Sequence, residues 1–399
     1  MLLKGKNILL GVTGGIAAYK SCELLRALIK QGATVNVAMS ENAKKFITPL
    51  TCQTLSGNPV LNSTFDTEQN AEIKHISLPD EADSFVIAPA TANIIGKLAN
   101  GIADDFISTM ALAYTKSIIL SPAMNIHMYE NKIVQYNLNK LKKFGFTVIE
   151  PAIGYLACGY EGRGRLPEIE LITDLVINSI IEKDLQGISV VITAGPTREH
   201  IDPVRYISNP STGKMGYSIA KLLAFRGATV NLVSGPSNMP AAYNVNITNV
   251  TSAEEMNREV EKLIPKADLF IGTAAVADYR PVKYSNKKIK KESNGKKLNI
   301  DTVKNPDIIS NVSKIAPNVK IMGFAAETND LINNAKEKLS RKKLDLIFAN
   351  DLTKNGSGFG TDTNSGILIK KNGEKIKFDI QSKEELANKL IDEIKKLFY

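Results

Sequence analysis

The sequence predicts an α/β protein made of two doubly wound domains, each built around a mainly parallel sheet. Two observations carry this prediction. A strand–turn–helix–strand pattern opens the chain, and the same pattern begins again near residue 189. The pentapeptide Gly-Ala-Thr-Val-Asn also occurs twice, beginning at Gly32 and at Gly227. Because a single sheet would not restart in this way, we expect two nucleotide-binding domains in tandem.

The first repeat opens with an apolar run at 7–12 that is typical of a buried parallel strand. A glycine turn at 13–15 follows, and apolar residues at helical spacing then run from 16 to 31. Gly32 ends that helix, as a C-terminal glycine commonly does. Residues 34–39 give the next strand, which completes a β-turn-α-β unit of a Rossmann-like sheet.

The second repeat has a strand at 189–193, a helix at 217–226 and a strand within 227–233. A charged helical stretch from 170 to 183, followed by Gly187, is the expected connection between the repeats. We therefore expect one domain over 1–186 and a second over 187–399.

The bulk composition is that of a globular protein. Of the 399 residues, 43% are hydrophobic and 23% are charged, which argues against long disordered segments. No stretch approaches the roughly 18 apolar residues that span a bilayer, so no membrane partner is expected. The first ten residues are interrupted by Lys4 and Lys6 and resemble a strand more than a signal peptide. We expect a cytoplasmic protein.

Cysteine and histidine are too few and too scattered for a structural role. The three cysteines, Cys22, Cys52 and Cys158, are odd in number and widely separated, so no disulfide framework or zinc site is indicated. The net charge of +9 instead predicts anionic partners, either nucleic acid or phosphorylated metabolites.

The glycine-rich turns do not match the common nucleotide-binding fingerprints. Gly11-x-x-Gly14-Gly15 departs from G-x-G-x-x-G, so a nicotinamide cofactor is not indicated. The segment Gly213-Lys214-Met215 lacks the upstream glycine and the Ser/Thr of a P-loop. Each turn is either a plain tight turn or a helix start whose backbone N–H groups bind a phosphate.

Four segments of the first half place reactive side chains at strand ends or in loops. They are Lys74-His75, just before a loop; Ala88-Pro-Ala-Thr-Ala-Asn93; Pro122-Ala-Met124-Asn125-Ile-His-Met128; and the glycine loop 154–165 around Cys158. Taken singly, each has a structural explanation, for example a turn-forming asparagine. Their gathering at the strand ends of one domain favours a functional site.

In the second half, residues 283–297 hold seven lysines in fifteen residues. This run is either a solvated loop or a loop that closes over phosphate groups. Stacking on nucleic acid needs aromatics interleaved with the lysines, and only 6% of the chain is aromatic. Further polar segments are Gly272–Asp278, Asn305–Ile308, Gly323–Thr328 just after a strand, and Lys338 and Lys342 on one helix face.

These motifs resemble a known pair of enzyme families. The first-half set is similar to that of the flavin-dependent cysteine decarboxylases, which are homo-oligomers that bind FMN. With the second half, the whole chain resembles the bacterial bifunctional phosphopantothenoylcysteine decarboxylase/phosphopantothenate–cysteine ligases. The resemblance implies a flavodoxin-like decarboxylase domain followed by a Rossmann-like ligase domain, with trimer-based flavin domains and dimeric ligase domains.

For the flavin half, the resemblance implies specific residue roles. His75 would assist oxidation and decarboxylation, Asn125 would bind the substrate carboxylate, and Cys158 would protonate the ene-thiolate. Leu166 and Ile169 stand where methionine and a second proline are common, and neither position has a chemical role. The implied FMN site consists of Gly14, Gly15, Ile16, Ser40, Asn93 and Met124.

For the ligase half, the resemblance implies that CTP activates 4'-phosphopantothenate as an acyl-cytidylate, which the amine of cysteine then attacks. Arg205 and the critical Asn209 would hold the acyl-cytidylate. Magnesium is implied by the triphosphate chemistry, although its ligands are unknown. Lys288 is the expected lysine of the mobile loop. The implied CTP positions are Gly272, Thr273, Ala274, Asp278, Lys288, Asn305, Pro306, Asp307, Ile308, Phe324, Lys338 and Lys342.

We therefore expect two successive steps of coenzyme A synthesis, in which ligation is followed by FMN-dependent decarboxylation to 4'-phosphopantetheine. Phosphorylated substrates and CTP would account for the basic charge without nucleic acid. Two alternatives stay open from the sequence: a nucleic-acid-binding protein with a vestigial flavin site, and a flavin-binding oligomerisation domain that supports a working ligase.

Overall fold

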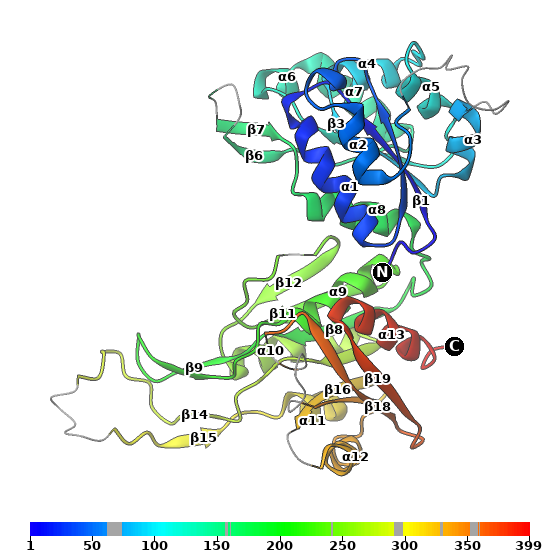
Figure 1. Ribbon diagram of the computed structural model, residues 1–399. Coiled ribbons are helices and arrows are strands. Elements are labelled where there is room, and N and C mark those ends of the chain that lie inside the picture. The colour runs from blue at the N-terminus through cyan, green and yellow to red at the C-terminus, as the bar shows by residue number, and fades with distance from the viewer. Residues whose placement is uncertain are drawn as a thin grey trace. The chain divides into compact units, whose positions relative to one another are not determined.

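The structure is a computed structural model of the 399-residue chain (Figure 1). It describes residues 1–61, 74–155, 159, 161–240, 242–290, 298–327, 330–351, 358 and 360–399. The chain divides into two compact units, Met1–Ile181 and Glu182–Tyr399, whereas the sequence led us to expect a division near residue 186. Each unit is described by itself.

The first unit is built on a five-stranded parallel sheet of order β2-β1-β3-β4-β5. The chain moves outward in one direction from β1 to β2 and then returns past β1 to β3. This is the flavodoxin-like order, whose ligand-binding switch point lies between β1 and β3. The strands are β1 (Asn7–Val12), β2 (Thr34–Met39), β3 (Ser84–Ala90), β4 (Ile118–Pro122) and β5 (Thr147–Val148).

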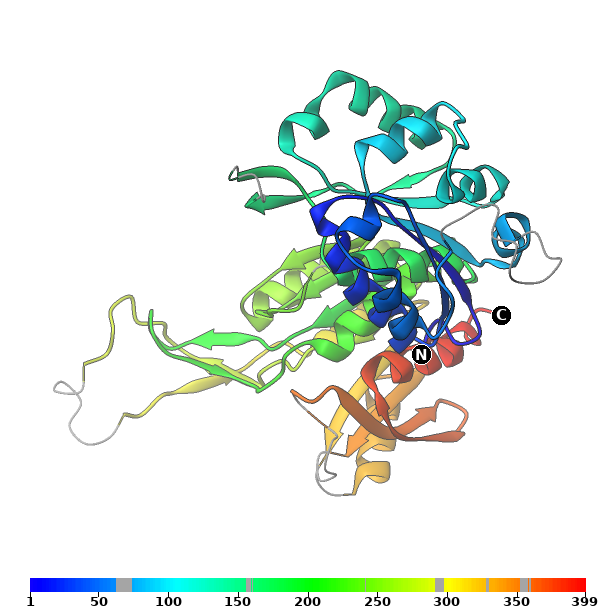
Figure 2. The same ribbon diagram turned by 45° about the horizontal axis from the view of Figure 1, so that its top comes forward.

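Helices pack in two groups around this sheet (Figure 2). One group contains α1 and α8, which contact each other, and the other contains α3, α4, α5 and α7. The helix expected from residue 16 begins as a 3-10 turn, η1 (Ile16–Tyr19), and becomes α-helical only at Lys20. The helices are α1 (Lys20–Lys30), α2 (Pro49–Ser56), α3 (Lys74–Glu81), α4 (Ala92–Ala99), α5 (Phe106–Ala113), α6 (Ile126–Glu130), α7 (Lys132–Lys143) and α8 (Ile169–Ile180), with η2 (Ala43–Lys45).

The second unit has an eight-stranded sheet of order β12-β11-β8-β13-β16-β17-β18-β19. The first six strands run parallel in the Rossmann order, and β18 and β19 add an antiparallel pair at one edge. The switch point lies between β8 and β13. The strands are β8 (Ser189–Ala194), β11 (Thr229–Ser234), β12 (Val245–Asn249), β13 (Leu269–Gly272), β16 (Lys320–Glu327), β17 (Leu346–Asp351), β18 (Thr363–Lys370) and β19 (Lys375–Ser382).

Helices α9 and α13 of the second unit pack against each other, and α10 packs against α11. The helix expected from residue 217 begins three residues earlier, at Lys214, directly after Gly213 in a left-handed conformation. The α-helices are α9 (Lys214–Phe225), α10 (Ala253–Leu263), α11 (Ile308–Ile315), α12 (Leu331–Arg341) and α13 (Lys383–Lys395), with the 3-10 turn η3 (Ile264–Lys266).

Two antiparallel hairpins form arms that reach away from the second sheet in both views (Figures 1 and 2). One arm is β9 (Arg198–His200) with β10 (Tyr206–Ser208), and the other is β14 (Tyr279–Pro281) with β15 (Thr302–Lys304). The arms expose many large apolar side chains to solvent. These are Val204, Tyr206, Tyr279, Val282, Tyr284, Leu298, Ile300 and Val303.

Both sheets are buried at their centres, as the apolar runs predict. Phe85 in the first unit and Phe270 in the second are fully enclosed. Within the described ranges, no helix is long and apolar enough to cross a membrane.

Candidate active sites

The first unit contains a cavity of about 960 Å³ at the carboxyl ends of its strands. It lies at the switch point, where the turns after β1 and β3 face each other, and the segments after β2 and β4 complete its wall. The structure brings together here all six residues of the expected flavin site and the expected carboxylate-binding asparagine. They are Gly14, Gly15, Ile16, Ser40, Asn93, Met124 and Asn125.

Hydrogen bonds tie the two central turns of this cavity together. The hydroxyl of Thr13 donates to the carbonyl of Pro89 at 2.7 Å and accepts from the backbone N–H of Thr91 at 3.1 Å. Gly14 is required for a steric reason, because a Cβ there would lie 2.3 Å from the Cβ of Asn42. The turn after β1 is therefore fixed against both of its neighbours.

Asn125 is oriented by its position at the start of α6. Its Oδ1 accepts the backbone N–H of His127 at 2.8 Å, as an N-cap side chain does. With the amide oxygen used in this way, the NH2 group is the end that can donate to a ligand. This arrangement suits recognition of a carboxylate.

A hairpin of β6 (Ala152–Tyr155) and β7 (Glu161–Arg165) packs on the same segment. The backbone N–H of Met124 donates to the carbonyl of Gly164 at 3.0 Å. Gly164 has a φ of 158°, and a Cβ there would lie 2.2 Å from the carbonyl oxygen of Met124. The hairpin thus closes one side of the cavity, to which Tyr155 contributes. Cys158 lies outside the described residues.

His75 does not lie where the sequence led us to expect it. It is the second residue of α3, not a residue just before a loop, and it is not among the residues that line the cavity. The following residues, 76–81, continue the helix in spite of Pro79.

The cavity also contains an ion-pair cluster whose members were not among the expected site residues. Lys97 is 2.6 Å from both Asp104 and Asp105. Burial opposes the charged form of Lys97, but the two carboxylates outweigh it and raise its pKa. Asp105 also caps α5. The only local signal for this pair was Asp105 at an N-cap position, three residues before Ser108, which indicates a helix start and not a site.

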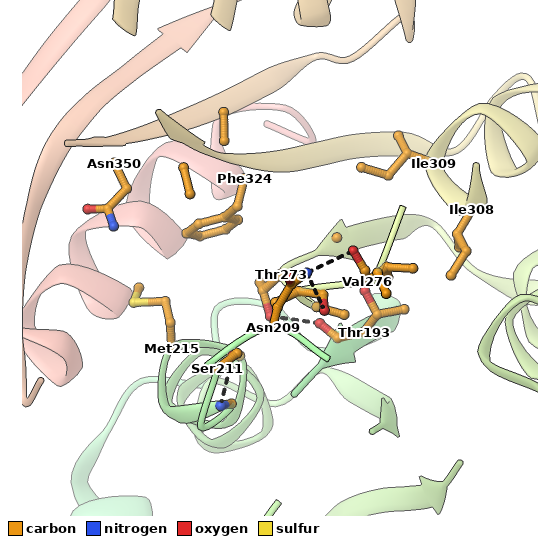
Figure 3. A pocket seen from close by; sticks show the side chains of 18 of the residues that line it. Thr193, Asn209, Ser211, Met215, Thr273, Val276, Ile308, Ile309, Phe324 and Asn350 are labelled. Carbon is orange, nitrogen blue, oxygen red and sulfur yellow. Dashed lines mark hydrogen bonds between the residues drawn. The ribbon is translucent and has the colours of Figure 1, made fainter. Parts of the chain in front are cut away.

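The second unit contains a cavity of about 670 Å³ at the ends of β8, β13, β16 and β17, next to the start of α9 (Figure 3). It again lies at the switch point of its sheet. Among the expected CTP positions, those that line this cavity are Gly272, Thr273, Ala274, Asp278, Asn305, Pro306, Asp307, Ile308, Phe324, Lys338 and Lys342. Asn209 lines it as well.

The segment after β13 is held by side-chain hydrogen bonds, some of which Figure 3 shows. Asn209 Nδ2 donates to the carbonyls of Ala275 at 3.3 Å and Val276 at 3.1 Å. The Thr273 hydroxyl donates to the carbonyl of Thr193 at 2.7 Å. Asn209 therefore shapes the cavity wall in addition to facing its interior.

Two lysines from the end of α12 also line this cavity. Lys338 Nζ donates to the carbonyl of Phe324 at 3.1 Å, and Lys342 Nζ is 2.8 Å from Asp307 Oδ1. Burial tends to raise the pKa of Asp307, but the hydrogen bonds from Lys342 and Ser310 outweigh it, and the pKa lies below its usual value. Phe324 lies within β16 and not after it, which corrects the sequence-based expectation.

Arg205 and Lys288 do not line the cavity of their own chain. Arg205 donates to the buried Asp202 through Nε at 3.0 Å and to the carbonyl of Ile289 at 2.8 Å. The backbone N–H of Ile289 in turn donates to Asp202 at 3.2 Å. The exposed Lys288 directly precedes Ile289, which these hydrogen bonds hold in place in the segment between β14 and β15.

Several cavity residues gave no functional signal in the sequence. Lys214 was visible only in a segment that fails as a P-loop, and Lys383 belongs to the last helix, far from every motif. Arg341, Asn350 and Asn364 also line the cavity. In the described part of the chain, no group of three His, Cys, Asp or Glu side chains is placed to hold a metal ion.

Comparison with known proteins agrees with this division. Residues 2–181 match the flavoprotein family model, and residues 185–398 match the DNA/pantothenate metabolism flavoprotein C-terminal domain. The chain is 48% identical over 396 residues to the coenzyme A biosynthesis bifunctional protein CoaBC of Haemophilus influenzae, covering 99% of this chain and 98% of the relative. It is 44% identical over 397 residues to the Bacillus subtilis protein of the same name, covering 98% and 97%.

Among solved structures, the crystal structure of the C-terminal domain of a coenzyme A biosynthesis bifunctional protein is similar, with 35% identity and a TM-score of 0.47 over 54% of this chain and 98% of that one. The two family models fall on the two structural units, and the relatives match over nearly their full length. The chain therefore belongs to the family of coenzyme A biosynthesis bifunctional proteins, enzymes that join a flavoprotein decarboxylase unit to a ligase unit.

Proposed function

We propose that the second unit joins 4'-phosphopantothenate to cysteine at the expense of CTP, and that the first unit decarboxylates the product to 4'-phosphopantetheine with FMN. The observation that carries this proposal is the clustering of expected ligand residues in two separate cavities, each at the switch point of its own sheet. We propose the division of these activities between residues 1–186 and 187–399, with the segment 182–186 packing with the second unit.

The first cavity fits a flavin in size and chemistry. Its volume is within the roughly 300–1,000 Å³ of cofactor sites. The turn at Gly14 and Gly15 leads into the start of a helix, where N–H groups suit a phosphate, and Ser40 lies beside it. Ile16, Met124 and Leu166 offer apolar surface for a ring system. FMN bound there would supply a reversible hydride acceptor, so that the carbon bearing the thiol can be oxidised before CO2 is lost and reduced again afterwards, with no net oxidation.

The chain's own residues would orient the substrate and move its protons. The Asn125 NH2 group donates to the substrate carboxylate and holds it in place until CO2 leaves. Cys158 protonates the ene-thiolate that remains, a task for which a thiol with an ordinary pKa near 8.5 is suited. His75 assists the oxidation and decarboxylation half.

In the second cavity, Thr273, Asn305 and Phe324 would contact the nucleotide, and Lys338 and Lys342 would neutralise its charge. Asn209 would hold the acyl-cytidylate while the cysteine amine attacks, with Arg205 supporting that segment. Mg²⁺ would be bound mainly through triphosphate oxygens, since Asp278 and Asp307 are the only carboxylates among the described residues that line this cavity. Such sparse protein ligation is usual for Mg²⁺ that arrives with a nucleotide.

We propose a homo-oligomer in which neighbouring copies complete both sites. Lys288 lies outside the cavity of its own chain, on the side of arms that expose a row of apolar residues including Tyr206 and Tyr279. His75 likewise lies outside the flavin cavity of its own chain. Trimer-based flavin units and paired ligase units would place these residues in the sites of neighbouring copies.

The test is a two-stage assay on purified protein whose visible spectrum is recorded first. The chain is mixed with 4'-phosphopantothenate, cysteine, Mg²⁺ and CTP, with ATP as the control nucleotide, and pyrophosphate and CO2 are followed separately. We expect a yellow protein that releases both. Pyrophosphate without CO2 would favour a flavin unit that only supports the ligase, and a colourless protein that releases neither would contradict the proposal.

A further inference from the structure

Two lysines without a role in the proposed function lie together on one wall of the second cavity. Lys214 is the first residue of α9, and Lys383 is the first residue of α13. Both line the cavity. Because α9 and α13 pack against each other, residues separated by more than 160 positions in the chain present their ammonium groups to one space.

Lys383 is a buried cation. Its residue is 7% exposed, and its Nζ donates to the carbonyls of Gly358 at 3.1 Å and Thr361 at 2.6 Å. Among the residues that the structure describes, no carboxylate lies within 4.0 Å of this nitrogen. Burial, and then the positive charge of Lys214, lower its pKa. An ammonium held only by carbonyl groups is costly to bury, so an anion in the cavity would stabilise it.

The partner of Lys214 is an exposed carboxylate that a ligand can replace. Its Nζ is 2.6 Å from Asp362 Oδ1, and the Asp362 side chain is 89% exposed. An ion pair with so exposed a partner contributes little to stability, because water screens it. A phosphate carries more charge than a carboxylate and can therefore displace Asp362 from Lys214 at small cost.

The backbone beside Lys214 is arranged for the same ligand chemistry. Gly213 adopts a φ of 81° and begins the 12-residue helix α9 without a side-chain cap. Residues 211–216 line the cavity, so the positive end of the helix dipole faces it. The two lysines and the helix start therefore all contribute positive charge to the same cavity.

We propose that Lys214, Lys383 and the first turn of α9 form a subsite for the polyphosphate of the nucleotide. Asp362 pairs with Lys214 until a phosphate takes its place. The ligand class is a nucleoside triphosphate and the pyrophosphate that it releases. This inference rests on the proposed ligase function and adds residues from α13 to a site whose expected lysines come from α12 and the arm.

The experiment measures binding of inorganic pyrophosphate with Mg²⁺ to the full-length protein by isothermal titration calorimetry. We expect Lys383→Met and Lys214→Met each to weaken binding about tenfold or more, because each removes a charge-assisted hydrogen bond. Asp362→Asn should strengthen binding a few-fold, since it removes the competitor for Lys214. Lys389→Met removes an equal charge from the exposed side of α13 and should change binding less than about twofold.

The opposite signs of the lysine and aspartate variants make the result decisive. If Asp362→Asn weakens binding as Lys214→Met does, the pair merely holds the turn and the subsite is wrong. Wild-type affinity in both lysine variants, or no binding to the wild-type protein, would also overturn it. Should Lys383→Met fail to fold, the partly exposed Lys214 and the exposed Asp362 still provide the test.

Pyrophosphate binding does not require turnover, so the two proposals can fail separately. A protein that shows the expected pattern of pyrophosphate affinities but does not ligate with CTP contradicts the proposed function alone. A protein that ligates with CTP and whose lysine variants keep wild-type pyrophosphate affinity contradicts the subsite alone.

Discussion

The two units of this chain begin alike and diverge at their sites. Both open with a buried strand, a glycine turn and a helix, and both place a cavity at the point where the strand order reverses. The first cavity is closed by the hairpin of β6 and β7, and its lining combines apolar side chains such as Met124 and Leu166 with Asn125 and the Lys97 ion pairs. The second is lined by lysines from α9, α12 and α13. The sheet therefore decides where a ligand binds, and the segments added after each strand decide which chemistry is possible.

The largest expected effect separates the two activities at Asn125. Asn125→Ala should lower kcat/KM for CO2 release about 100-fold or more, because it removes a donor to the reacting carboxylate. Pyrophosphate release should not change. Asn131→Ala is the matched control, since Asn131 caps α7 as Asn125 caps α6 but does not line the cavity. If both variants lose kcat/KM for CO2 release equally, Asn125 acts only as a helix cap.

The next effect concerns the hairpin of β6 and β7, which closes one side of the first cavity. Gly164→Ala should cost the protein its bound flavin, because the new Cβ would lie 2.2 Å from the Met124 carbonyl oxygen. The visible absorbance of the purified protein measures the loss, and ligation serves as the internal standard. Gly145→Ala, which has positive φ but nothing within 4 Å, controls for backbone strain. Retention of flavin by Gly164→Ala would mean that the hairpin does not shape the cavity.

A smaller effect is expected at the lysines of the second unit. Lys342→Met should raise KM for CTP about tenfold while kcat for CO2 release from added 4'-phosphopantothenoylcysteine stays constant, because one charge-assisted contact to phosphate is lost. Lys336→Met, which removes an equal charge from an exposed position of the same helix that does not line the cavity, is the comparison variant. If Lys342→Met instead lowers thermal stability without changing KM, its ion pair with Asp307 is structural.

The smallest effect concerns the stability of the second unit and not its cavity. Asp184 pairs with Arg226 at 2.6 Å and with Lys395 at 2.9 Å, and its pKa is lowered to about 2, chiefly by the hydrogen bonds from Arg226. The stabilisation is therefore present above about pH 4 and is lost as the pH falls towards 2. We expect Asp184→Asn to lower the Tm of this unit by several degrees at pH 7 and to flatten the decline between pH 4 and pH 2. An unchanged pH profile would contradict this.

Sequence patterns were most informative where local physics decides the structure. Apolar runs of six residues predicted β1 and β2 with their observed bounds, because parallel strands are buried on both faces. Phe324 was expected after its strand, but β16 continues to Glu327 because it pairs with β17 along that whole length. Such pairing between distant segments has no local signal.

The sites were predictable only in part for the same reason. Motifs after strands identified Asn93, Asn125 and Thr273, since the topology carries strand ends to one edge. Lys383 could not be found, because its role depends on how α13 packs against α9. His75 illustrates the converse, since its segment was recognised but its helical setting outside the cavity was not.

The ion pairs of Asp184 have a practical consequence for anyone who separates the two activities by cutting the chain. The family match for the second unit begins at residue 185, one position after this aspartate. A fragment that starts there leaves Arg226, which is almost entirely buried, with one carboxylate fewer, and a start at 187 also discards the buried Leu185. If a ligase fragment made at either point is slow or short-lived, we expect the lost contacts at the cut to be the cause. A fragment that starts at Glu182 keeps the whole unit.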